Sequence, residues 1–191
     1  MTKLKKPEPL KISCTATDCK NDLHCFKATQ RMPKEDRGKC RECNADLVDW
    51  ERVQSRDIKD AAHTFDALKR ELIRHTFFHR EMDPWAINYA RRKGRTDLKT
   101  AAKTRLEKYL APANPYRDGQ QTPFEKNPIF YAQHATATCC RTCLDYWHAI
   151  PKGRPLSDDE VEYCLALIEH YFDERLANVK AEGEHVPPIR A

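Results

Sequence analysis

Two cysteine pairs with the same spacing, Cys40-Arg-Glu-Cys43 and Cys140-Arg-Thr-Cys143, constrain this chain more than any other feature. A Cys-x-x-Cys turn places two thiolates on one side of a tight loop, which suits half of a tetrahedral zinc site. The chain has nine cysteines, and its first residues lack the apolar stretch of a secretory signal. Because thiols stay reduced in the cytosol, metal binding explains so many cysteines better than disulfides do. We therefore expect a cytoplasmic zinc protein with one or two Zn²⁺ ions per chain.

The first cysteine pair has further soft ligands upstream of it. Four residues could complete a zinc site there: Cys14, Cys19, His24 and Cys25. We favour Cys14 and Cys19, because their spacing makes a second short loop. The predicted first site is therefore Cys14, Cys19, Cys40 and Cys43. Four thiolates leave no open coordination position, so this site is expected to be structural and not catalytic.

The second cysteine pair lies among more possible ligands than one metal ion needs. If residues 140–149 form a helix, Cys140 and Cys143 share one face, whereas His148 lies about 12 Å from Cys140 along the axis. The other ligands should then come from elsewhere, and the predicted second site is His79, His134, Cys140 and Cys143. A merged arrangement, in which the two Cys-x-x-Cys pairs form a single four-thiolate site, stays open at this point.

Two classes of zinc enzyme are disfavoured by the motifs. His75 and His79 have the spacing of the metalloprotease motif, but Thr76 occupies the position of the catalytic Glu. Zinc deaminases need a Glu two residues after the ligand His and a Pro before the cysteine pair, and neither accompanies His134 or Cys140. A metal-dependent hydrolase or nuclease remains an alternative, with four candidate catalytic residues: His134, His148, Asp118 and Arg154.

Charge is distributed unevenly along the chain. Residues 67–110 carry twelve Lys or Arg against five acids, whereas residues 157–178 carry seven acids against one Arg. Cations concentrated in a helical segment can contact adjacent phosphates. We predict binding of nucleic acid, DNA or RNA, through six cations: Arg91, Arg92, Lys93, Arg95, Lys99 and Arg105. The acidic segment supports a further alternative, a protein-interaction adaptor that binds a basic partner.

No window approaches the length of apolar sequence that a membrane span needs.

Apolar periodicity indicates a mainly α fold of four to five helices. Helices are predicted over about 57–79 and 84–93, then from Asp97 to the prolines near 112, over 140–149, and from the capping box at Ser157 onward. The proline-rich stretch over 111–133 is expected to be a loop. Four regions follow: a flexible arm over 1–10, a zinc-ribbon-like β/loop module over 11–54, a helical domain over 55–178 and a flexible tail over 179–191.

The run from His134 to Arg154, HATATCCRTCLDYWHAIPKGR, resembles an uncharacterised bacterial and phage family of unknown function. The upstream segments Arg105-Leu106 with Ala111-Pro112, and Asp118–Pro123, look like the same family, and the resemblance covers about residues 76–177. The family brings no activity with it. Its shorter members lack the N-terminal cysteines, which implies that the Cys-rich module is an addition and that the second site works without the first.

Overall fold

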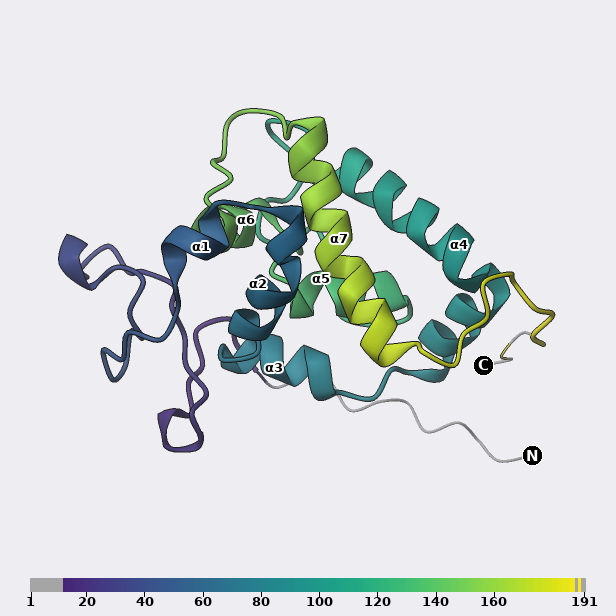
Figure 1. Cartoon of the computed structure of the whole chain (residues 1–191), viewed down its shortest axis with the longest axis horizontal. Coiled ribbons are helices and arrows are strands. Elements are labelled where there is room, and N and C mark those ends of the chain that lie inside the picture. The colour runs from purple at the N-terminus through teal and green to yellow at the C-terminus, as the bar shows by residue number, and fades with distance from the viewer. Residues whose placement is uncertain (1–11, 188, 190–191) are drawn as a thin grey trace.

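A computed structural model describes residues 12–187 and residue 189 of the chain, so the predicted arm over 1–10 lies outside the described residues. The described residues form seven α-helices connected by loops and short 3-10 turns (Figure 1). Their bounds in chain order are α1 Trp50–Gln54, α2 Ala61–Leu68, α3 Leu72–His79, α4 Pro84–Tyr109, α5 Pro128–Ala135, α6 Arg141–His148 and α7 Asp158–Arg175. The mainly helical class is confirmed, but the predicted number of four to five helices was wrong.

Tertiary contacts account for two of the differences in helix count. The single helix predicted over 57–79 is divided at Glu71, whose backbone is extended (φ −89°, ψ 125°) and forms a β-bridge with His24. Conversely, α4 includes both helices predicted on either side of Gly94, with a kink at Gly94, whose angles are non-helical (φ 68°, ψ 168°). Long-range backbone contacts lie at both places, between Glu71 and His24 and between Arg95 and Lys180.

The last part of the predicted loop over 111–133 is helical, because α5 begins at Pro128. Pro128 occupies the first turn of α5, and the Asn127 side chain accepts a hydrogen bond from the Ile129 N–H at 3.0 Å. Proline in the first turn and Asn at the N-cap are both favourable for a helix start. The capping signal was present in the sequence, but the short helix that follows it was missed. Helix α1, which follows an Asp49 cap, was missed in the same way.

The main hydrophobic core is organised around α7. This helix packs against α2, α4 and α5, and α3 packs on α5; in Figure 1, α7 runs between α2 and α4. The capping box predicted at its start is present, since Ser157 and Glu160 each accept the backbone N–H of the other. Its apolar residues, including Leu165 and Ile168, are fully or almost fully buried. None of the helices in the described part of the chain combines the length and apolar character needed to span a membrane.

A smaller apolar cluster joins the N-terminal segment, residues 12–49, to the helices. The Trp147 ring on α6 lies 5.8 Å from the Phe26 ring and 5.1 Å from the Trp50 ring, centroid to centroid. The N-terminal segment itself has little regular structure: the β-pairing among the described residues consists of isolated bridges and no named strand. It is therefore a set of loops packed on the helical domain, and direct contacts cross the boundary predicted between residues 54 and 55.

The basic and acidic segments noted in the sequence lie against each other. Helix α4 packs on α7, and three ion pairs connect the two helices: Arg95 with Asp173, Lys99 with Glu169 and Lys103 with Glu162. The Lys99 ammonium is 2.9 Å from its partner carboxylate. The order of these pairs runs in opposite directions along the two helices, so the helices are antiparallel. Ion pairs within the chain thus neutralise much of the charge asymmetry that the sequence shows.

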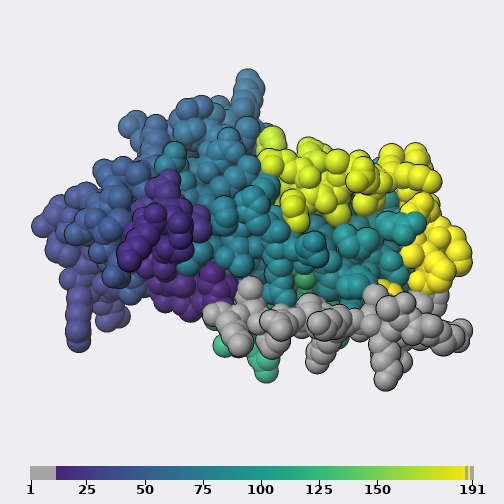
Figure 2. All heavy atoms as spheres, turned by 90° about the horizontal axis from the view of Figure 1, so that it is seen from below, coloured from purple at the N-terminus to yellow at the C-terminus, as the bar shows by residue number. Residues whose placement is uncertain are grey.

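The C-terminal segment closes the interruption that Gly94 makes in α4. Because Gly94 leaves the helical path, nearby backbone groups lose their intrahelical partners. The N–H groups of Arg95 and Thr96 donate instead to the carbonyls of Lys180 and Ala181, at 2.9 and 3.1 Å. Figure 2 shows the C-terminal segment (yellow) lying beside the middle of the chain (teal). Residues 180–184, within the predicted flexible tail, thus have defined hydrogen bonds to α4.

Candidate metal centres

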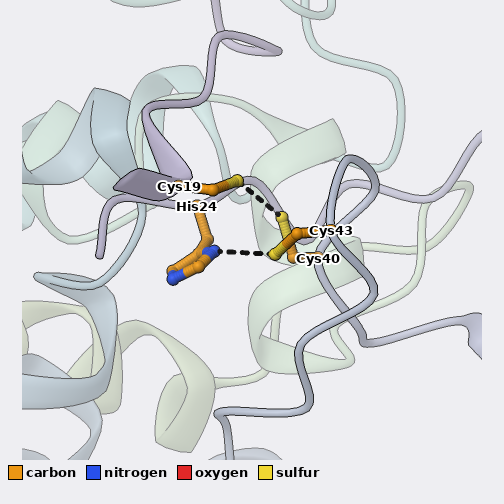
Figure 3. Close-up of side chains that lie close together, drawn as sticks. All are labelled: Cys19, His24, Cys40 and Cys43. Atoms are coloured by element: carbon orange, nitrogen blue, oxygen red, sulfur yellow. Dashed lines mark hydrogen bonds between the residues drawn. The ribbon is translucent and has the colours of Figure 1, made fainter. Parts of the chain in front are cut away.

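Cys19, His24, Cys40 and Cys43 form a compact group of metal-binding atoms, here called the first cluster. Their sulfur and nitrogen atoms all lie within 4.8 Å of one another. Cys19 Sγ is 3.7 Å from Cys40 Sγ, and His24 Nδ1 is 3.5 Å from Cys43 Sγ (Figure 3). Tetrahedral zinc, with Zn–S near 2.3 Å and Zn–N near 2.0–2.1 Å, places such atoms about 3.8 and 3.6 Å apart. The observed separations therefore fit one tetrahedral zinc ion with three sulfur ligands and one nitrogen ligand.

The backbone around Cys40 is shaped to hold a thiolate. Asn44 has a left-handed conformation (φ 59°), and its N–H donates to the Cys40 carbonyl at 2.8 Å, which closes a tight turn. Burial acts to raise the pKa of the Cys40 thiol, but backbone N–H groups of Cys43, Cys25 and Glu42 outweigh it and lower the pKa to about 6. The thiolate is the form of cysteine that binds metal.

His24 is oriented by a carboxylate on the far side of its ring. Its Nε2 donates to Asp22 Oδ1 at 2.9 Å, which leaves Nδ1 facing the cysteines. Metal-bound histidines commonly have such an outer partner, because it fixes the tautomer and raises the basicity of the ligating nitrogen. Asp22 itself adopts a left-handed conformation (φ 58°) at the end of a short 3-10 turn that begins at Cys19. This turn brings Cys19 and His24 to the same side of the loop.

The first cluster differs from the predicted set in one ligand. The structure brings together Cys19, Cys40 and Cys43 as expected, but it places His24 in the fourth position and Cys14 outside the cluster. Cys14 lies before the 3-10 turn that begins at Cys19, and it lines the cavity that the second group of cysteines borders. One signal in the sequence could have identified His24 as a ligand. Asp22 lies two residues before it, close enough in the chain to accept a hydrogen bond from the ring nitrogen that does not face the metal.

Cys139, Cys140 and Cys143 form the second cluster. All three side chains are buried, and their sulfur atoms lie within 4.8 Å of one another. Cys139 Sγ and Cys143 Sγ are 3.6 Å apart, close to the sulfur separation in a tetrahedral zinc site. The two Cys-x-x-Cys pairs therefore belong to separate clusters, so the merged four-thiolate arrangement does not occur in the part of the chain that the structure describes. Cys139, absent from the predicted set, is part of this cluster.

A fully buried ion pair supports the second cluster. The Arg74 guanidinium donates from Nη2 to Cys143 Sγ at 3.1 Å and from Nε to Glu71 Oε2 at 3.0 Å. The Glu71 carboxylate also accepts hydrogen bonds from the Tyr146 hydroxyl and the Trp147 indole, each at 2.8 Å. Hydrogen bonds from neighbouring thiols, together with the charge of Arg74, hold the pKa of Cys143 well below its usual range. The arrangement thus favours a thiolate at the buried Cys143.

His134 lies near the second cluster without joining it. Its Nε2 is 3.2 Å from the carbonyl oxygens of both Thr122 and Pro123, and its ring stacks on Phe77 at 4.4 Å. Its Nδ1 is buried and has no hydrogen-bond partner among the described residues. Burial is the main cause that lowers the pKa of His134 to about 4. This neutral ring and the three cysteines contribute to the wall of a cavity of about 400 Å³.

The other two histidines of the predicted sites lie outside both clusters. His79, on α3, lies with its ring centroid 4.1 Å from that of His75. His148 is fully buried in the helical core, where its Nε2 is 3.0 Å from the Thr136 carbonyl oxygen and its Nδ1 is 3.2 Å from the Tyr163 hydroxyl. Burial lowers the pKa of His148 to about 4, so the ring is neutral near pH 7. His148 is therefore a buried core residue whose two ring nitrogens both have partners within the protein.

The four candidate catalytic residues have partners of their own. Asp118 is 2.8 Å from the Lys152 ammonium, and Arg154 is 2.6 Å from the Glu160 carboxylate at the start of α7. Among the described residues, neither group of potential metal ligands includes Asp118, His134 or His148.

The six predicted phosphate-binding cations fall into three groups. Arg95 and Lys99 pair with acids of α7, and Arg91 pairs with Glu184 of the C-terminal segment. Arg105 donates to the Gln133 side chain at 2.7 Å, and its guanidinium lies over the rings of Tyr109 and Phe130. The remaining two cations, Arg92 and Lys93, form no ion pair with the residues that the structure describes.

A shallow groove runs along α4 on the side away from these ion pairs. It encloses about 500 Å³ and is bordered by cationic and aromatic side chains that include Tyr89, Lys93, Lys108 and Tyr109. Helical periodicity places Thr100, Thr104 and Lys108 on one face of α4, opposite the face that carries Arg95 and Lys99.

Comparison with known proteins identifies the region that contains the second cluster. No solved structure matches the chain. Residues 62–173 match the model of a family described as Domain of unknown function (DUF4186). The match extends from α2 through most of α7 and includes Cys139, Cys140 and Cys143, whereas the first cluster lies N-terminal to it. The match covers more than half of the length of the chain, so the chain belongs to the DUF4186 family.

Proposed function

We propose that this chain is a zinc protein in which a structural ion holds the N-terminal loops on a helical domain, and that the helical domain binds nucleic acid through α4. The observation that carries the zinc assignment is the geometry of the first cluster. Its three sulfur atoms and one imidazole nitrogen have the separations of a tetrahedral site, and His24 has the outer carboxylate typical of a metal ligand.

The set of ligand atoms in the first cluster favours Zn²⁺ over other common cations. Mg²⁺ and Ca²⁺ prefer oxygen ligands, whereas thiolate and imidazole together suit zinc. Three cysteines and one histidine would fill all four positions of a tetrahedral ion, which leaves none for a substrate. We therefore assign a structural and not a catalytic role to this ion.

The zinc assignment is tested by metal content and by two substitutions at His24. We expect purified protein to contain zinc in the first cluster, His24→Cys to retain it, and His24→Ala to bind it at least tenfold more weakly. Metal content by mass spectrometry and competition with a chromophoric chelator measure these quantities. The same zinc affinity in His24→Ala as in the unmodified protein would contradict the assignment.

The nucleic-acid part of the proposal is supported by the groove along α4. Aromatic faces can stack on unpaired bases while nearby cations contact the phosphates, a combination common in proteins that bind single strands. Tyr109 is 43% exposed and borders this groove beside Lys108. Because the cations that face α7 are paired, we propose a smaller contact set than the charge pattern suggests: Arg92, Lys93 and Lys108.

A salt titration with labelled single-stranded DNA and RNA tests this interface. We expect binding at low salt that weakens as salt rises, with the logarithmic slope reduced by about 0.7 for each phosphate contact removed. Lys93→Ala with Lys108→Ala should lower both the affinity and this slope. Lys99→Ala, which removes a paired cation of the same helix, is the matched control and should change them much less. Absence of binding at low salt, or equal losses in the two variants, would rule out the proposed interface.

A further inference from the structure

The second cluster has three thiols where a closed structural zinc site has four ligands. No fourth Cys, His or carboxylate of the described residues lies within 4.8 Å of all three sulfur atoms. The cluster instead borders the cavity of about 400 Å³, and a further cysteine, Cys14, contributes to the same wall. We propose that Cys14 is the fourth ligand of a second Zn²⁺ centre, formed with Cys139, Cys140 and Cys143, which ties the N-terminal segment to the family domain.

Helix α6 prepares its three cysteines for a metal. Cys140 is the N-cap of this helix, with an extended backbone (φ −160°, ψ 164°), and Cys143 lies in its first turn. Anionic groups are stabilised at a helix N-terminus by the helix dipole and the free N–H groups. The sulfur separation of 3.6 Å between Cys139 and Cys143 already fits tetrahedral coordination. Three buried thiols in contact, with no disulfide among them, are explained by a shared cation.

Arg74 supplies the outer partner and the compensating charge. Four thiolates and one Zn²⁺ carry a formal charge of −2, which is costly to bury without a cation nearby. Arg74 donates to Cys143 Sγ at 3.1 Å and approaches Cys139 Sγ at 3.8 Å, so its guanidinium lies against two of the proposed ligands. Hydrogen bonds of this kind to ligating atoms orient them and tune the metal site.

Cys14 is positioned by the loop that also forms the first cluster. Its carbonyl accepts a hydrogen bond from the thiol of Cys25, which immediately follows His24, at 3.6 Å. Its side chain borders the cavity, and a change of χ1 between staggered rotamers moves a cysteine sulfur by about 3 Å. Although Cys14 is exposed in part to solvent, it lines the same cavity as Cys139, Cys140 and Cys143.

His134 is the competing candidate for the fourth position. Its Nδ1 is buried without a partner and its ring lines the same cavity. However, the ring is held between Phe77 at 4.4 Å and Phe124 at 4.8 Å, and its Nε2 contacts two backbone carbonyls. These contacts hold the imidazole in the wall, outside the cluster. Cys14 lines the same cavity, and among the described residues no aromatic ring stacks against it in this way.

Cobalt substitution distinguishes the two candidates, because sulfur-to-cobalt charge-transfer absorbance grows with the number of thiolate ligands. The full chain loaded with Co²⁺ should bind two ions, with seven thiolates in total. We expect Cys14→Ser to lower the charge-transfer absorbance by the contribution of one thiolate and to weaken binding of one of the two ions at least tenfold. Cys14→His should restore the affinity without restoring that absorbance. Cys164→Ala, which removes a buried thiol of α7 that belongs to neither cluster, should change neither quantity.

Two outcomes would overturn this assignment. One is a Cys14→Ser protein with unchanged affinity and absorbance; the other is a loss of the second ion in His134→Gln that does not occur in Cys14→Ser. The result remains separable from the zinc assignment at the first cluster. A protein that binds one ion, lost in Cys40→Ser but kept in Cys140→Ser, would refute the second centre and leave the first intact, and the reverse pattern would do the opposite.

Discussion

The N-terminal segment and the helical domain are held together by different interactions. Residues 12–49 bury four apolar or cysteine side chains, Cys25, Phe26, Cys40 and Val48, and one of these is a member of the first cluster. The helical domain, in contrast, has a continuous core in which α7 contacts three other helices. A loop segment of this size cannot offset its conformational entropy by apolar burial alone, so metal ligation is expected to replace the missing core.

The comparison also shows where the two regions depend on each other. The buried Glu71 separates α2 from α3 and pairs through its backbone with His24 of the first cluster. Its side chain pairs with Arg74, which donates to Cys143 of the second cluster. Substitutions can therefore be chosen that affect one region, the other, or the contact between them.

Removal of zinc should have the largest effect, and it should be confined to the N-terminal segment and its contacts. Structural zinc in small modules contributes on the order of 10 kcal/mol to folding. We expect chelation, or Cys40→Ser, to abolish hydrogen-exchange protection around residues 18–44 while α4 and α7 keep most of theirs. Simultaneous loss of protection throughout the chain would show instead that the two regions fold as one cooperative unit.

Breaking the buried ion pair should be the next largest effect. Arg74→Met leaves Glu71 charged, fully buried and without its cation, which typically costs about 3–5 kcal/mol. Urea denaturation measures the change in the free energy of unfolding. Arg154→Met is the matched control, because the pair between Arg154 and Glu160 is partly exposed and should contribute about 1 kcal/mol or less. Similar losses in both variants would contradict the importance assigned to burial at Arg74.

A side chain at Gly94 should destabilise the helical domain at its contact with the C-terminal segment. A Cβ there would lie 2.3 Å from the Glu182 carbonyl carbon, and Gly94 also has a positive φ. We expect Gly94→Ala to cost about 1–3 kcal/mol and to reduce hydrogen-exchange protection over residues 180–184. Gly153→Ala measures the cost of the positive φ alone, because Gly153 has a similar φ of 81° and nothing lies within 4 Å of the added carbon. An equal effect at both glycines would mean that the close approach is unimportant.

His148 should give the helical domain a modest acid sensitivity of its own. The pKa of His148 is about 4 in the folded protein, below the usual value of about 6.5 expected after unfolding. Between these values the unfolded chain binds a proton that the folded chain does not, so stability falls as the pH is lowered through this range. The loss is about 1.4 kcal/mol for each pH unit below 6.5. Denaturation of wild type and His148→Gln at pH 6.5 and 5.5 measures the difference in slope; parallel slopes would exclude this linkage.

Local signals in the sequence were sufficient for some features of the structure. The Asp83-Pro84 start of α4 and the Ser157 capping box depend on residues within one helical turn, and both are present. The cysteine pairs likewise indicated two groups of possible metal ligands, since a Cys-x-x-Cys turn positions its own sulfur atoms. In contrast, the place of His24 depends on how the loop turns at Asp22, and that of Arg74 on its contacts with Cys143 and Tyr146 of α6.

By itself, the sequence determined the mainly helical class, the principal caps and the presence of two cysteine-rich clusters, because each follows from contacts between near neighbours in the chain. The tertiary structure decided which side chains complete those clusters and which charges remain free. Hydrogen bonding and ion pairing act between residues far apart in sequence: they placed Arg74 against Cys143 of the second cluster, and they paired the cations of α4 with the acids of α7. The physical reason is that hydrogen bonds, metal ligation and ion pairs depend on which groups are close together in space, and folding determines which groups these are.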